Sequence, residues 1–292
     1  MPFTIADSFA RLRSNLEITD IQSSVVSTRQ QTIRRTVANG LTVTEDFLTG
    51  SYARSTMISP LSEADIDIFI CLDSSYFHHY NRANGGPAGL LNLARQTIRK
   101  TYTSTPDISR NGQAVTVRFS DFVVDVVIGF YRNGGGYIIA NSANNFWLET
   151  DPKRHVEIFS QANKQHNGNL VPLIKMIKSW NKGNGSFFRS FHLEVLALEA
   201  LRGVHITDFP SGLRFFFQKA MSLVRGQNLD PAGYGDDIGR YITQSTIGEA
   251  SQKFQTAFNM AVAAEQYAVR GKIRESVEIW RHLLPNHFPA YG

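Results

Sequence analysis

The chain has 292 residues, of which 42% are hydrophobic and 19% charged, and its formal net charge at pH 7 is +5. This composition is typical of a soluble globular protein that is long enough to bury a sizeable core. The single cysteine, Cys71, excludes an intrachain disulfide and a cysteine-rich zinc site. The Lys and Arg residues are scattered, so the positive charge favours small polyanionic ligands over an extended nucleic-acid surface.

The N-terminal region is expected to be helical and to hold no membrane anchor. The first 15 residues contain no uninterrupted apolar stretch, and no later window approaches a membrane span, so we expect a cytoplasmic protein without a membrane partner. From about Ala6 to Asn39, apolar residues recur at helical spacing. The pattern is interrupted near Ile18, where Thr19 or Asp20 is a candidate N-cap for a second helix.

A glycine-serine turn follows the apolar pair at positions 47–48. Gly50 and Ser51 precede a segment, residues 52–57, that can begin a helix. Free backbone N–H groups at a helix start, beside a glycine that allows close approach, can bind a phosphate. Most glycine-serine pairs are ordinary turns, so this pair alone leaves both interpretations open.

Two aspartates lie a single residue apart in a segment that is otherwise typical of a buried strand. Asp65 and Asp67 alternate with Ile66 and Ile68, so the carboxylates share one face of the strand and the isoleucines share the other. Like charges this close repel one another and are costly to bury, which predicts a cation beside them. Mg²⁺, with phosphates in its coordination shell, is the candidate. The alternative is an edge strand that ends in two hydrated aspartates.

Two metal ions would need a third carboxylate, and residues 121–128 offer two. Asp125 lies between β-branched residues, which predicts a central strand that pairs with the first. Asp121 lies four residues before Asp125 and so would share the same face of the strand, but it lies at the strand start, where a hydrated aspartate is ordinary. We therefore predict that Asp65, Asp67 and Asp125 hold two Mg²⁺ ions, with Mn²⁺ as a substitute.

These motifs resemble those of a known superfamily. The chain has Gly50-Ser51, then thirteen further residues, then Asp-Ile-Asp-Ile and, much later, an aspartate in another expected strand. This order is similar to the signature of polymerase-β-like nucleotidyltransferases. Residues 150–155, 171–181 and 190–196 resemble the second domain of oligoadenylate synthetases, cyclic GMP-AMP synthase and the bacterial CD-NTases, which make cyclic oligonucleotide signals in CBASS antiphage defence. The resemblance covers nearly the whole chain, and the compact length is most similar to the CdnE clade, which accepts pyrimidine nucleotides.

The resemblance implies an α+β fold with two lobes. Residues 1–150 are expected to form a polymerase-β-like nucleotidyltransferase lobe with a small mixed sheet and a long N-terminal spine helix. Residues 151–292 are expected to form a helical lobe of the oligoadenylate-synthetase type that closes the active-site cleft. The patterns predict a surface loop at 73–89, a crossover at 141–151, strands at 115–119, 122–130 and 137–139, and helices at 90–102, 170–180, from 190, and twice within 247–281.

Phosphate-binding residues follow from the same resemblance. Ser51 and the neighbouring amides, with Gly50, would hold the β and γ phosphates. Lys175 and Lys178 lie one turn apart on the expected helix at 170–180. Lys178 would bind the triphosphate as a point charge, whereas the alternative is an ordinary solvated lysine.

Base-binding residues are implied in the second lobe. Phe191 would stack on a nucleobase, with Ser190 hydrogen-bonding nearby, whereas the alternative is a buried core phenylalanine. The pyrimidine-accepting clade has an asparagine near the base, and either Asn167 or Asn169 could match it. A helix cap is an equally good use of both asparagines.

The predicted activity is the joining of UTP with ATP, or of UTP with UTP, into a cyclic dinucleotide with release of pyrophosphate. We expect a monomer whose product activates a downstream effector protein, and no zinc-dependent DNA sensing. One alternative is a single-transfer nucleotidyltransferase that acts on an RNA, small-molecule or protein acceptor. The other is an inactive nucleotide-binding regulator, against which the intact carboxylate set argues.

Overall fold

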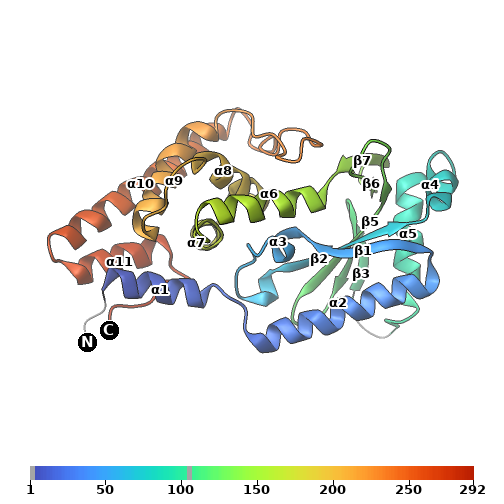
Figure 1. Cartoon of the computed structure of the whole chain (residues 1–292), viewed down its shortest axis with the longest axis horizontal. Coiled ribbons are helices and arrows are strands. Elements are labelled where there is room, and N and C mark those ends of the chain that lie inside the picture. The colour runs from blue at the N-terminus through green and yellow to red at the C-terminus, as the bar shows by residue number, and fades with distance from the viewer. Residues whose placement is uncertain (1–3, 104–106) are drawn as a thin grey trace. The chain divides into compact units, whose positions relative to one another are not determined.

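The computed structural model describes residues 4–103 and 107–292, and its contacts divide the chain into two units. One unit is Ile18–Glu157, and the other combines the segment that ends at Glu17 with Ile158–Gly292 (Figure 1). The first helix belongs with the C-terminal residues because the Phe9 ring packs against those of Trp280 and Phe288, with centroids 5.0 and 5.1 Å away. The predicted division at residue 150 had instead placed this helix with the first lobe.

The N-terminal helical region consists of two helices, α1 (Ile5–Asn15) and α2 (Asp20–Gly40). Thr19 is the N-cap of α2 and forms a capping box with Gln22: each side chain accepts a hydrogen bond from the backbone N–H of the other residue. The predicted interruption is confirmed, and Thr19 rather than Asp20 makes the cap.

A seven-stranded mixed sheet forms the core of the Ile18–Glu157 unit. Strands β2 and β5 are parallel at its centre, and the other strand pairs are antiparallel. The strands pair in the order β1 (Val43–Thr49), β2 (Asp65–Leu72), β5 (Val123–Tyr131), β4 (Ala114–Arg118), β3 (Asp107–Asn111), while β6 (Tyr137–Asn141) pairs with β5 and with β7 (Phe146–Thr150).

The side-chain alternation of β2 and β5 gives the sheet two different faces. Ile66, Ile68 and Val126 are fully buried and belong to the main core, which α2 and α5 (Gly86–Arg99) cover (Figure 1). On the opposite face, Phe69 and Tyr137 belong to a small second cluster farther along the strands. The predicted aspartates lie on this second face, because they alternate with the core isoleucines and valines.

The predicted surface loop at 73–89 is wrong in part. Residues Ser74–Tyr80 form a helix, α4, whose N-cap Asp73 accepts a hydrogen bond of 3.0 Å from the Ser75 N–H. Phe77 and other aromatic side chains of α4 pack against the main core, which holds this segment as a helix. The expected crossover at 141–151 likewise contains strand β7.

The other unit is helical around an aromatic core. The Phe188 ring stacks on those of Trp180 and Phe254, with centroids 5.9 and 4.6 Å away. No helix in residues 4–103 and 107–292 combines the length and apolar character that crossing a membrane requires. The helices after the sheet are α6 (Pro152–Gln165), α7 (Leu170–Gly183), α8 (Ser190–Ala200), α9 (Phe209–Leu223), α10 (Ile247–Val269) and α11 (Ile273–Leu283).

Candidate active site

The aspartates of β2 and β5 meet on one face of the sheet. Asp67 and Asp125 are direct partners across the parallel strands, so their side chains point to the same side. Asp65, two residues before Asp67, shares that face and is exposed, whereas Asp67 and Asp125 are half-buried. The strand register therefore places Asp125 beside Asp67, on the face of the sheet that Asp65 shares.

Thr116 is a neighbour of these carboxylates that the sequence analysis did not identify. It pairs with Asp125 across the antiparallel strands β4 and β5. Its hydroxyl donates a 2.5 Å hydrogen bond to Asp125 Oδ1, and the residue is 1% exposed. Thr116 therefore fixes one oxygen of Asp125 within the sheet.

Gly50 lies directly against Asp67. Thr49, the last residue of β1, pairs with Asp67, and Gly50 begins α3 (Gly50–Ala53) with a φ of +65°. A methyl group at Gly50 would lie 1.7 Å from Asp67 Oδ2, so only glycine fits between this turn and the carboxylate. The Ser51 carbonyl accepts hydrogen bonds from the N–H groups of Thr56 and Met57, at 2.9 and 3.1 Å, which holds the turn in place.

Asp121, the other carboxylate considered for the third position, has a different environment. It precedes β5 and forms an ion pair with Arg29 of α2. The Arg29 guanidinium lies over the rings of Phe119 and Phe122, 4.4 and 4.8 Å from their centroids. Asp121 therefore belongs to an ion pair beside the main core, apart from the Asp67–Asp125 pair.

The donor set suits a hard divalent cation, because carboxylate oxygens are the ligands that Mg²⁺ prefers. Within the described ranges, no three His, Cys, Asp or Glu side chains are gathered as a ready-made metal site. The fit therefore rests on the shared face, the register of Asp67 with Asp125, and the space that Gly50 leaves beside Asp67. Like charges on one face repel, and a cation bound between them would lower that repulsion.

Lys178 lies in the helical unit and contacts a carboxylate there. Its side chain is 7% exposed, and Nζ lies 3.1 Å from Oε1 of Glu194, which is fully buried on α8. Lys175 is also nearly buried, and its Nζ lies 2.6 Å from Oε2 of Glu17. The burial of Lys178 contradicts the alternative of an ordinary solvated lysine, and its contact with Glu194 is one that the sequence did not predict.

Ser190 and Phe191 form the first turn of α8. Ser190 is exposed, and Phe191 is half-buried, with its ring centroid 6.4 Å from that of Phe159 on α6. One side of the Phe191 ring therefore packs within the unit, while the residue keeps exposed area. This environment is intermediate between a core phenylalanine and an open stacking platform.

The two asparagines before α7 differ in conformation. Asn167 is exposed and has a φ of +52°, in the left-handed region where asparagine is favoured among non-glycine residues. Asn169 is the N-cap of α7, but its side chain makes no capping hydrogen bond. The side chain of Asn163 bonds the helix start instead, accepting a 3.0 Å hydrogen bond from the Val171 N–H.

A buried histidine ties the start of α8 to the long segment between α9 and α10. Nε2 of His192 is 2.6 Å from Asn228 Oδ1, and Nδ1 is 2.9 Å from the Tyr241 hydroxyl. Because the amide oxygen only accepts, Nε2 carries the proton and Nδ1 accepts from Tyr241. The Tyr241 oxygen in turn accepts a 2.9 Å hydrogen bond from the Arg189 N–H. Burial lowers the pKa of His192 and so favours the neutral ring in this network.

This network predicts that stability falls in mild acid. Burial lowers the pKa of His192, and the positive charge of Arg189 lowers it further. The hydrogen bond to Asn228 and the negative charge of Asp237 act in the opposite direction and raise this pKa, but burial has the largest effect. The stability gained from neutral His192 is complete above the ordinary pKa of about 6.5 and is lost as pH falls toward the lowered value. Thermal melts between pH 8 and pH 5 should show this loss, and the His192→Gln variant should lack that part of the pH dependence. Parallel curves for the two proteins would contradict the assignment.

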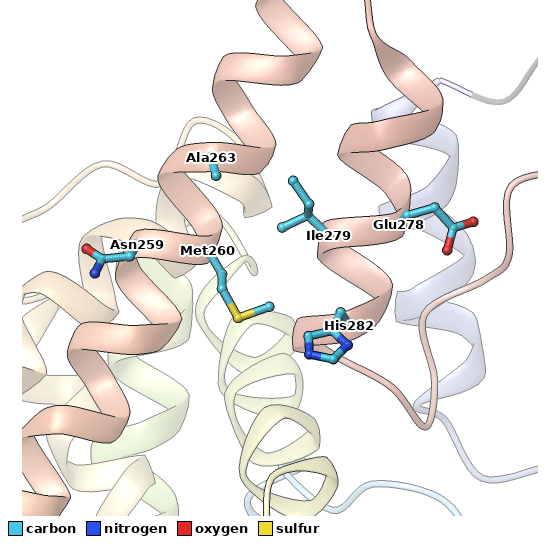
Figure 2. A pocket seen from close by; sticks show the side chains of 6 residues that line it. All are labelled: Asn259, Met260, Ala263, Glu278, Ile279 and His282. Carbon is cyan, nitrogen blue, oxygen red and sulfur yellow. The ribbon is translucent and has the colours of Figure 1, made fainter.

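A pocket lies between α10 and α11 (Figure 2). Its lining is mainly apolar, and the side chains of Met260 and Ile279 extend from the two helices toward the gap between them. None of the predicted site residues lines it. The lining residues are Asn259, Met260, Ala263, Glu278, Ile279 and His282.

The mixed sheet, with its aspartate pair beside a glycine-serine turn, agrees with the arrangement that the resemblance to nucleotidyltransferases implies. Residues 3–163, which are 161 of the 292, match the Second Messenger Oligonucleotide or Dinucleotide Synthetase (SMODS) domain. The chain therefore belongs to this family of cyclic nucleotide synthases. The predicted CD-NTase family is confirmed, and the CdnE clade stays a prediction.

Relatives and a solved structure agree with this assignment. The chain is 25% identical over 272 residues to a probable cyclic nucleotide synthase of Bacillus cereus (strain VD146), covering 83% of this chain and 81% of that protein. It is 26% identical over 261 residues to the cyclic AMP-AMP-AMP synthase of Acinetobacter sp. (strain ATCC 27244 / 9458), covering 83% and 72%. The structure of E. coli MS115-1 CdnC with ATP matches with a TM-score of 0.78 and 18% identity, covering 98% of this chain and 99% of CdnC. The α+β fold predicted from the sequence is confirmed.

Proposed function

We propose that this protein joins nucleoside triphosphates into a cyclic oligonucleotide and releases pyrophosphate. The observation that carries the proposal is the register of Asp67 with Asp125, with Gly50 against Asp67. Membership of the SMODS family supports the same activity. An inactive regulator would have no need to keep three carboxylates on one face at an electrostatic cost.

We assign the metal-binding role to Asp65, Asp67 and Asp125. Two Mg²⁺ ions held there would lower the pKa of an acceptor 3′-hydroxyl and neutralise charge on the triphosphate and the leaving pyrophosphate. Asp125 would also accept the proton that the hydroxyl loses. Thr116 would support this role, because its hydrogen bond fixes one oxygen of Asp125.

We assign nucleotide binding to the residues that the resemblance implies. Gly50, Ser51 and the neighbouring amides would hold the β and γ phosphates, as the resemblance implies. Lys178 would neutralise charge on the triphosphate, and Phe191 would stack on a base beside Ser190. Asn167 is the better candidate for a base contact, because it is exposed, whereas half-buried Asn169 occupies the N-cap position of α7.

The family resemblance and one relative both include ATP among the candidate substrates. The resemblance to the pyrimidine-accepting clade predicts UTP with ATP or UTP with UTP. The Acinetobacter relative is a cyclic AMP-AMP-AMP synthase, which favours ATP and leaves the ring size open between two and three nucleotides. We therefore propose ATP as one substrate and retain UTP as the predicted second.

A labelling experiment tests this proposal. The protein is incubated with Mg²⁺ and all four nucleoside triphosphates, labelled one at a time, and the products are treated with phosphatase. A cyclic product has no terminal phosphate, so its label survives the treatment. We expect surviving label from ATP, and from UTP if the clade prediction is right, with mass spectrometry giving the ring size.

The alternatives predict different outcomes of the same experiment. Label from ATP without UTP would retain the enzyme class and reject the pyrimidine prediction. Pyrophosphate release that requires an added RNA, small-molecule or protein acceptor would support single transfer instead. Mg²⁺-dependent nucleotide binding with no turnover under Mg²⁺ or Mn²⁺ would support the inactive regulator.

The cellular setting remains part of the proposal. A cyclic product would activate a downstream effector protein in antiphage defence, as the resemblance to CD-NTases implies. A monomer in the cytoplasm is the corresponding prediction for the protein itself. Size-exclusion chromatography with light scattering would test the monomer directly.

A further inference from the structure

The segment between α9 and α10, residues 224–246, is long and consists of turns and irregular backbone (Figure 1). Connections of more than about 12–15 residues without regular structure are uncommon in compact proteins, and many of them serve a binding or catalytic site. Asn228 closes this segment on itself, because its backbone N–H donates to Asp237 Oδ1 at 3.0 Å and its carbonyl accepts from the Ile238 N–H at 2.8 Å. The segment therefore has a conformation that its own hydrogen bonds stabilise.

Two side chains of this segment contact the start of α8. Asn228 Oδ1 is 2.6 Å from Nε2 of His192, and the Tyr241 hydroxyl is 2.9 Å from Nδ1 of the same ring. The Tyr241 oxygen also accepts a 2.9 Å hydrogen bond from the backbone N–H of Arg189. One hydroxyl group therefore binds two residues at the start of α8 that are three positions apart.

Arg189 is the N-cap residue of α8, and its side chain has no acceptor with which to cap the helix. Its guanidinium lies over the Tyr241 ring, 4.5 Å from the centroid. Tyr241 therefore contacts Arg189 twice, through its hydroxyl group and through its ring.

Ser190 and Phe191 lie between the two residues that Tyr241 binds. Both keep exposed area, whereas His192 is 1% exposed. A buried polar network whose members are hydrogen-bonded rigidifies the structure around it, so the ties on both sides restrict the backbone of this pair. A stacking ring benefits from the restriction, because the face that it offers to a base is then set before the base binds.

We propose that Tyr241 is a positioning residue for nucleotide binding, which sets the orientation of Phe191 toward a nucleobase. The inference rests on the proposed function, because it takes Phe191 as the base-stacking residue. Without the Tyr241 hydroxyl, the Arg189 N–H and the His192 ring lose their shared partner, and the first turn of α8 gains freedom. The phosphates of the nucleotide are assigned to other residues, so this change should weaken the contact with the base alone.

Calorimetric binding of a non-hydrolysable ATP analogue and of inorganic tripolyphosphate, both with Mg²⁺, tests this role without turnover. Tyr241→Phe removes the hydroxyl and keeps the ring beneath the Arg189 guanidinium. We expect it to weaken binding of the ATP analogue about tenfold, a loss within the range that stacking of one base contributes. The affinity for tripolyphosphate should be unchanged, because tripolyphosphate has no base.

The matched control is Tyr267→Phe on α10. Tyr267 is half-buried in the same unit, and its ring centroid lies 5.8 Å from Lys272 Nζ. This variant also loses one tyrosine hydroxyl, and it should leave both affinities unchanged.

A double-mutant cycle separates positioning from a general loosening of the fold. In a Phe191→Ala background, Tyr241→Phe should have no further effect on affinity for the ATP analogue, because its role acts through the Phe191 ring. An effect of equal size in both backgrounds would contradict the proposal. Thermal melts establish that each variant is folded at the temperature of the binding measurements.

Three further results would overturn the proposal. A lower melting temperature for Tyr241→Phe, with unchanged affinity for the ATP analogue, would make the network purely structural. Equal losses of affinity for the ATP analogue and for tripolyphosphate would mean that the effect does not act on the base. Wild-type affinity for Phe191→Ala would remove that ring from the base site, and the positioning role with it. Synthesis of cyclic product by the wild-type protein is measured separately, so each of these results leaves the proposed function to its own test.

Discussion

The Asp65→Asn, Asp67→Asn double variant is expected to make no detectable cyclic product while remaining folded. An amide cannot replace the negative charge that a carboxylate offers a divalent cation, so the loss should exceed about a thousandfold, equivalent to several kcal/mol of transition-state stabilisation. Asparagine is close in size to aspartate, so the packing of β2 should be kept and the melting temperature should change by only a few degrees. Product formation by chromatography and thermal unfolding are the two measurements.

Single variants at Asp125 and Asp121 provide the matched comparison. Asp125→Asn should abolish product as fully as the double variant, because Asp125 is the register partner of Asp67. Asp121→Asn should retain activity and lose only the ion pair with Arg29. An inactive Asp121→Asn beside an active Asp125→Asn would reverse the assignment of the third carboxylate. Substantial synthesis by the double variant would remove the metal-binding role altogether.

Local patterns were sufficient to predict the strand elements of this site. The alternation of Asp65 and Asp67 with isoleucines predicts both a strand and the face on which the carboxylates lie. The capping signal at Thr19 is equally local, since its partner Gln22 is three residues away. Such features depend on neighbours along the chain, so sequence spacing alone identifies them.

Partners that are distant in sequence could not be predicted in the same way. The alternation of side chains along β5 places Asp125 on one face of that strand, but only the register of the two parallel strands makes it the neighbour of Asp67. Thr116 gave no signal, because a threonine in a strand is ordinary. Glu194 did offer one, since a glutamate within a strongly apolar helix predicts a buried cationic partner. Helix α4 was missed because histidines and serines mask the spacing of its aromatic residues.

Substitution of Gly50 by alanine is expected to abolish activity at a modest cost in stability. A left-handed φ of +65° costs a residue with a Cβ about 1–2 kcal/mol. The added methyl would lie 1.7 Å from Oδ2 and 2.5 Å from Cγ of Asp67, so this carboxylate must move from its position beside Asp125. Displacing a proposed metal ligand by such a distance should reduce product formation about a hundredfold or more. The melting temperature should fall by only a few degrees.

Gly112→Ala separates the backbone strain at Gly50 from the displacement of Asp67. Gly112 lies in the turn between β3 and β4 with a φ of +59°, and a methyl group there would meet nothing within 4 Å. The same strain should therefore lower its melting temperature by a similar amount while the rate of product formation stays at the wild-type level. Equal losses of activity in the two variants would mean that strain in this unit is sufficient to inactivate the enzyme. A loss confined to Gly50→Ala would mean that the contact between the turn and Asp67 sets the geometry of the carboxylates.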